Sequence, residues 1–117
     1  MNIGIDLDDV VYDTSAEVEK EIEKANNPLL VEYKVQIMRG AMKGVPEEIA
    51  NFLTDTIITY TENAKPIKNA ISTLRKLKED GHIITIITAR SDMMRDGVVD
   101  STLKSMKKYG IDKGLLY

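Results

Sequence analysis

Two short apolar segments, each ending at polar side chains, most constrain how this chain can fold. Ile83–Ile87 is almost entirely β-branched and ends at Thr88, and the segment Asn2–Leu7 leads directly into Asp8. Runs of this kind are typical of strands in a parallel sheet that is covered on both faces. The sequence therefore predicts two buried strands with polar residues at their carboxyl ends.

Helices are predicted between and after these strands. Thr14 followed by Glu17 has the spacing of a capping box, and apolar residues then recur at helical spacing as far as Ala25. The other predicted helices run from about 29 to 38, from Pro46 to Tyr60, from Pro66 to Gly81 and from about 100 to 109. A third strand is predicted to begin at Leu115.

This order of elements favours an α/β fold with parallel strands joined by right-handed crossovers. Residues from about 14 to 64 contain more helix than one crossover needs, so we expect a small helical cap inserted after the first strand. The prediction is a single domain, residues 1–117, with a core of residues 1–13 and 65–117. Ligands in such folds bind at the carboxyl ends of the strands.

Composition argues against several classes of protein. The 117 residues carry a net charge of -3, and the lysines are scattered among glutamates, so no basic stripe is available for a nucleic-acid polymer. The chain has no cysteine, its apolar runs are too short to span a membrane, and its N-terminus lacks the pattern of a signal peptide. We therefore expect a cytoplasmic protein that binds neither nucleic-acid polymers nor membranes.

Asp6 and Asp8 are two carboxylates at alternate positions directly after a predicted strand. Side chains at this spacing point to the same side while the chain is extended, so two negative charges converge and favour a bound cation. Mg²⁺ prefers a few carboxylate and carbonyl oxygens, which fits such a site. The alternative interpretation is a solvated acidic turn. Thr88 and the N–H groups that follow it are suited to binding phosphoryl oxygens.

The strand Asn2–Leu7 with Asp6 and Asp8, and the strand Ile83–Ile87 ending in Thr88, resemble the first two motifs of the haloacid dehalogenase-like (HAD) superfamily. The resemblance covers nearly the whole chain and looks most like the deoxyribonucleotidase-like branch. It implies a Rossmann-like parallel sheet core with the inserted helical cap. It also implies a Mg²⁺-dependent phosphomonoester hydrolase, acting as a 5′-nucleotidase on (deoxy)nucleoside monophosphates.

The same resemblance implies a role for each site residue. Asp6 would be the nucleophile that forms an aspartyl-phosphate, and Asp8 would be the proton shuttle. Thr88 and the Ala89 N–H would hold the phosphoryl group of a small phosphorylated substrate. Asp6 and Asp8 would also bind the Mg²⁺ ion. Arg90 is left open between a phosphate contact and a surface ion pair.

The chain departs from the superfamily's pattern towards its end. The expected lysine and second acidic pair are not found before Tyr117, so we expect that the C-terminal part of the core is missing. The alternative function is therefore a noncatalytic remnant of the fold, or an interaction module. The first strand would then expose an unpaired edge, through which the chain would dimerise, swap segments or aggregate.

Overall fold

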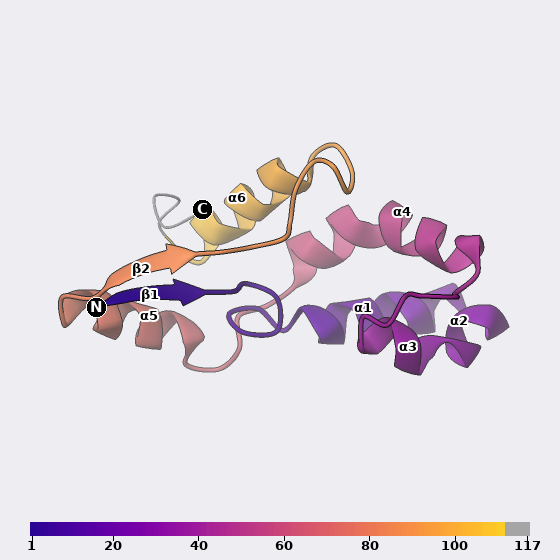
Figure 1. Cartoon of the computed structure of the whole chain (residues 1–117), viewed down its shortest axis with the longest axis horizontal. Helices are drawn as coiled ribbons and strands as arrows, with labels where there is room; N and C mark the ends of the chain where they lie inside the picture. The colour runs from indigo at the N-terminus through magenta and orange to yellow at the C-terminus, as the bar shows by residue number, and fades with distance from the viewer. Residues whose placement is uncertain (112–117) are drawn as a thin grey trace.

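The computed structural model describes residues 1–111, which are elongated along one axis with extents of 49 × 26 × 25 Å (Figure 1). The strands are β1 (Asn2–Ile5) and β2 (Ile83–Ile86). The helices are α1 (Thr14–Ala25), α2 (Pro28–Glu32), α3 (Lys34–Met38), α4 (Glu47–Asn63), α5 (Ala70–Glu79) and α6 (Val98–Lys108). Figure 1 shows the two strands with α5 and α6 at one end of the molecule, and α1, α2 and α3 at the other.

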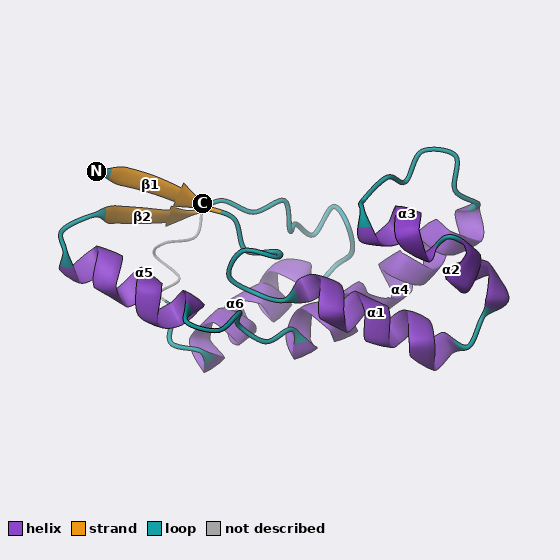
Figure 2. Cartoon of the chain, turned by 90° about the horizontal axis from the view of Figure 1, so that it is seen from below, coloured by secondary structure: helices purple, strands orange, loops and turns teal. Residues whose placement is uncertain are grey.

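The strands β1 and β2 pair in parallel, with Ile3 opposite Ile84 and Ile5 opposite Ile86. Both helices that pack on this sheet, α5 and α6, lie on the same side of it (Figure 2). Ile84 and Ile86 face these helices and are buried, whereas Ile83 is 64% exposed. One face of the sheet therefore belongs to a hydrophobic core, and the other face is left open by the helices of residues 1–111.

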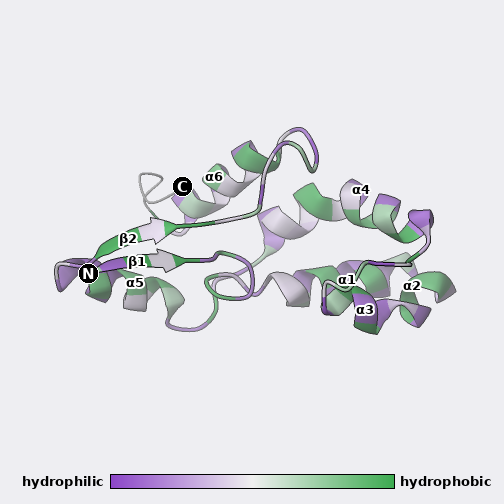
Figure 3. Ribbon diagram, in the orientation of Figure 1, coloured by the Kyte–Doolittle hydropathy of each residue, from purple (hydrophilic) through white to green (hydrophobic). Residues whose placement is uncertain are grey.

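Two separate groups of buried side chains stabilise the chain. The first lies between the sheet, α5 and α6 and consists of Leu7, Val11, Tyr12, Ala64, Leu74, Ile84, Ile86, Met106 and Ile111. The second lies among α1 to α4 and consists of Ile22, Leu30, Ile37 and Ile49. The helices carry hydrophobic residues on part of their surface and hydrophilic residues on the rest (Figure 3), as amphipathic packing requires.

The predicted fold class is wrong. An α/β fold with a Rossmann-like parallel sheet core was expected, whereas residues 1–111 are mostly helical and contain only a two-stranded sheet. The strands were placed correctly along the chain, but each is only four residues long. The helices α1 to α4 form a hydrophobic core of their own and make up a larger part of the molecule. The third strand predicted from Leu115 lies outside the described residues.

Several element boundaries also differ from the sequence prediction. The helix expected from Pro66 begins at Ala70, because Asn69 adopts a left-handed conformation with φ of 69° just before it. The segment before it pairs with the loop after β1 instead, since the Ile67 N–H donates to the Val11 carbonyl. The helix expected over 29–38 is divided into α2 and α3 at Tyr33. Within residues 1–111, no helix is long and apolar enough to cross a membrane.

Candidate functional site

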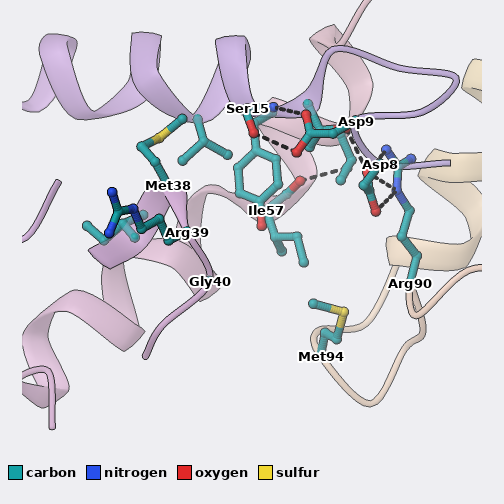
Figure 4. A pocket seen from close by; sticks show the side chains of 14 residues that line it. Asp8, Asp9, Ser15, Met38, Arg39, Gly40, Ile57, Arg90 and Met94 are labelled. Atoms are coloured by element: carbon teal, nitrogen blue, oxygen red, sulfur yellow. Dashed lines mark hydrogen bonds and ion pairs between the residues drawn. The ribbon is translucent and has the colours of Figure 1, made fainter. Parts of the chain in front are cut away.

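A cleft of about 360 Å³ lies between the two hydrophobic cores. Its walls come from α1, α3, α4 and the loops that follow β1 and β2 (Figure 4). The lining residues are Asp8, Asp9, Thr14, Ser15, Val18, Ile37, Met38, Arg39, Gly40, Ile57, Tyr60, Thr61, Arg90 and Met94. Ligand sites commonly occupy such positions between two packed units, and this volume is in their usual range.

An ion pair between Asp8 and Arg90 forms one end of the cleft. The Arg90 Nη2 donates to Asp8 Oδ1 at 2.6 Å, and its Nε donates to the two carboxylate oxygens at 3.1 and 3.3 Å. The Arg90 side chain is only 3% exposed, compared with 35% for Asp8. Thr14 Oγ1 also donates to Asp8 Oδ1 at 2.7 Å, so the carboxylate is engaged from two sides.

Contacts with Thr102 and Tyr12 also hold the Arg90 guanidinium in place. Its Nη1 donates to Thr102 Oγ1 at 3.4 Å, and its central carbon lies 5.3 Å from the centre of the Tyr12 ring. Ser105 Oγ in turn donates to the Tyr12 hydroxyl at 3.1 Å. These contacts connect the loop after β1, the loop after β2, and α6. The sequence analysis left Arg90 open between a phosphate contact and a surface ion pair, and the structure shows an ion pair in which the arginine is buried.

Two tyrosines beside this ion pair hold their protons more tightly than usual. Burial raises the pKa of Tyr60 above its ordinary value of 10.0, and the charge of Asp8 adds to this effect while that of Arg90 opposes it. Burial also raises the pKa of Tyr12, although the hydrogen bond with Ser105 lowers it in part. Tyr60 lines the cleft, so it presents a protonated hydroxyl there at neutral pH.

Asp9 stands at the cleft in an unusual backbone conformation. Its φ is 60°, a left-handed value that aspartate tolerates better than most residues. The side chain stabilises this turn, because Asp9 Oδ1 accepts from the Ser15 N–H at 2.9 Å and Oδ2 accepts from Ser15 Oγ at 2.6 Å. Both carboxylate oxygens of Asp9 are thus directed to the start of α1.

The four predicted site residues do not gather at one place. Asp6, Thr88 and Ala89 line a second hollow, of about 510 Å³, at the carboxyl ends of the strands. Asp8 lines the cleft instead. The chain turns between the two aspartates, because the Leu7 carbonyl accepts from the Val11 and Tyr12 N–H groups and Leu7 itself is buried. The extended geometry that was expected to align the two carboxylates therefore ends at Ile5.

No group of three or more histidine, cysteine, aspartate or glutamate side chains suited to a metal ion occurs within residues 1–111. Binding of Mg²⁺ by Asp6 and Asp8 stays a prediction, as does anion binding by Thr88 and Ala89. Thr88 already uses its hydroxyl oxygen, which accepts a hydrogen bond from the Arg90 N–H at 3.1 Å.

Sequence reasoning missed most of the cleft, including Tyr60, Thr14 and Arg39. Tyr60 was interpreted as one more apolar position on its helix, Thr14 only as a helix cap, and Arg39 was not considered. The spacing of Tyr60 within α4 gave no sign of its polar neighbours, because Asp8 and Arg90 are distant in sequence. An arginine directly before a glycine at the end of a predicted helix, as in Arg39–Gly40, was the one local signal available.

Comparison with known proteins gives the family. The model of the ChAPs family, described as Chs5p-Arf1p-binding proteins, matches residues 9–109. No curated protein matches the chain. This result overturns the resemblance to the HAD superfamily and with it the predicted phosphatase or 5′-nucleotidase activity and its small phosphorylated substrate. The match covers all six helices, β2 and every lining residue of the cleft except Asp8, whereas the resemblance depended on two strand ends. The chain belongs to the ChAPs family, the Chs5p-Arf1p-binding proteins.

Proposed function

We propose that this chain is a noncatalytic interaction module that binds protein partners. The observation that carries the proposal is the family match over residues 9–109, which includes both hydrophobic cores almost completely. The family is named for binding Chs5p and Arf1p, so these two proteins are the partners that we propose for this chain.

The surface of the molecule supports this role. Val31 and Val35 stand four residues apart at the junction of α2 and α3 and are 63% and 61% exposed. Met93 is 97% exposed and Met94 is 48% exposed in the loop after β2, next to the cleft. Exposed apolar side chains that gather in patches are typical of protein–protein interfaces, and methionine adapts well to a partner's surface.

The hydrogen bonds that Asp8 accepts also support a binding role. Its carboxylate accepts hydrogen bonds from Arg90 and Thr14 and is therefore held in a structural contact. An ion pair of this kind fixes the two loops that form the end of the cleft. A cleft with fixed walls favours binding, because less conformational freedom is lost when a partner docks.

The test is a direct binding measurement. Purified 117-residue chain is titrated with purified Arf1p and, separately, with purified Chs5p in a calorimeter, with serum albumin as the control protein. We expect saturable binding to at least one of the two proteins, with a dissociation constant on the order of micromolar or tighter. Absence of binding to both, by a chain whose circular dichroism shows it to be folded, would overturn the proposal.

A further inference from the structure

We infer that the cleft is the docking site for an extended segment of the protein partner, in which a carboxylate side chain stands next to an aliphatic one. The inference rests on the proposed function and adds to it the place of contact and the chemistry that is recognised. Three features of the cleft lead to it: its apolar wall, the Arg39 cation and the Tyr60 hydroxyl, the last two of which have no side-chain partner in the described part of the chain.

The apolar wall is made by side chains from three helices and one loop. They are Val18 of α1, Ile37 and Met38 of α3, Ile57 of α4 and Met94 of the loop after β2. Ile37 and Ile57 are buried and form a rigid floor, whereas Met94 is half-exposed and flexible at the rim. A wall of this composition fits an aliphatic side chain, and the volume of about 360 Å³ leaves room for a neighbouring residue.

Among residues 1–111, the charges of the cleft leave one cation, Arg39, without a partner. Asp8 is paired with Arg90, and Asp9 accepts two hydrogen bonds from Ser15. The Arg39 side chain, in contrast, is exposed and makes no ion pair or hydrogen bond with any of residues 1–111. Figure 4 shows Arg39 at the end of the cleft that lies away from the Asp8–Arg90 pair. A negative group on the partner would complement this end.

Tyr60 adds a neutral donor beside the apolar wall. Tyr60 lines the cleft, and its hydroxyl has no hydrogen-bond partner among residues 1–111. Guanidinium and hydroxyl groups both donate hydrogen bonds, and arginine in particular binds carboxylates through two parallel N–H groups. The residue that complements Arg39 is therefore an aspartate or glutamate of the partner, and Tyr60 can donate a hydrogen bond to a polar group beside the apolar wall.

The first experiment uses capped four-residue peptides, Gly-Leu-X-Gly, in which X is Glu, Gln or Lys. Each is titrated into ¹⁵N-labelled 117-residue chain and followed by amide chemical shifts. We expect the Glu peptide to shift the signals of Arg39, Gly40, Tyr60 and Met94. We expect the Gln peptide to bind about tenfold more weakly, as the loss of a charge-assisted hydrogen bond implies, and the Lys peptide more weakly still.

Substitutions then assign the charge effect to one residue. Arg39→Gln should abolish the preference for Glu over Gln, whereas Lys43→Gln should retain it, because Lys43 carries the same charge but lies outside the cleft. Equal binding of the three peptides, or shifts that map outside the cleft, would overturn the inference. A preference retained in Arg39→Gln would do so as well.

The same variants separate this inference from the proposed function. If Arf1p or Chs5p binds the chain, Arg39→Gln and Met94→Asp should each weaken that binding by about tenfold or more, as expected of residues central to an interface. Unchanged binding by both variants would place the interface elsewhere and refute the cleft, while the proposed function would stand. If the Glu peptide docks in the cleft but neither protein binds, the recognition chemistry stands and the proposed partners are refuted.

Discussion

Removing either partner of the Asp8–Arg90 ion pair should destabilise the fold, but by unequal amounts. The Arg90 side chain is 3% exposed, so Asp8→Ala leaves a buried guanidinium without its counter-charge. Breaking a buried pair in this way costs about 3–5 kcal/mol. Arg90→Met leaves the Asp8 carboxylate, which is 35% exposed and keeps its bond from Thr14. Because this carboxylate can recover water, we expect a smaller cost of about 1–3 kcal/mol.

The double variant Asp8→Ala/Arg90→Met provides the sharpest comparison. With no charge left in the site, it should be more stable than Asp8→Ala alone, and the coupling free energy between the two positions should be about 1–3 kcal/mol. These differences are large relative to a total free energy of unfolding of about 5–15 kcal/mol for a domain of this kind.

The assay is urea unfolding followed by circular dichroism at neutral pH, with midpoints and slopes compared across the four proteins. The slopes should be similar, so that the midpoints report stability alone. If Arg90→Met proves as destabilising as Asp8→Ala, unequal burial does not govern the cost. Strictly additive effects in the double variant would show that the two side chains are not coupled, and the reasoning would fail.

Three further predictions concern pH, backbone conformation and association. Because burial raises the pKa of Tyr12 and Tyr60 in the folded state, their contribution to stability is complete below the unfolded value near pH 10 and falls as pH rises above it. Thermal melts between about pH 8 and 11 should show this decline, and Tyr60→Phe should reduce it; an unchanged profile would contradict the assignment. Gly97→Ala should cost about 1 kcal/mol or more in urea unfolding, because φ at Gly97 is 95°. Gly4→Ala should cost under about 0.5 kcal/mol, since the new Cβ meets only the movable end of an exposed Ile87 side chain. Equal losses of stability in Gly97→Ala and Gly4→Ala would refute this distinction. The open face and edge of the sheet should make the chain associate with itself, and Ile87→Lys should lower its light scattering at high concentration. A stable monomer in the unsubstituted chain would count against this last prediction.

Local structure was predictable where neighbouring residues determine it. The β-branched run from Ile83 indicated β2, and the spacing of apolar residues indicated α1, α4 and α5. The start of α1 shows the limit of such reasoning. Thr14 was expected to cap the helix, but Asp13 occupies that position and accepts from the Ala16 N–H, while the Thr14 hydroxyl donates to Asp8. Both residues suit a helix start, and only the fold decides between them.

The candidate site was less predictable than the elements that carry it. Asp8 was identified from its place after a strand, but its partner Arg90 lies 82 residues away, and no local pattern connects them. The direction of the Asp8 side chain depends on the turn at Leu7, which the alternation of an extended strand cannot describe. The predicted enzyme was wrong for a related reason. A pair of aspartates after a strand is a short pattern, and a pattern of this length does not determine what a fold does.

The separation of the two hydrophobic cores has a consequence for how the molecule unfolds. No buried residue within 1–111 belongs to both cores. The two segments of chain that connect the cores lie side by side, where the Asp13 N–H donates to the Lys65 carbonyl at 2.8 Å. Cooperative unfolding requires that each part lose stability when the other is lost, and here the packing of α4 against α6 transmits that loss, with the buried Thr61 and Ser101 hydroxyls 3.3 Å apart. Hydrogen exchange should therefore show the amides of both cores opening together, and substitutions that weaken the packing of α4 on α6 should separate them into two groups with different opening free energies. A ligand that contacts both walls of the cleft would merge them into one transition.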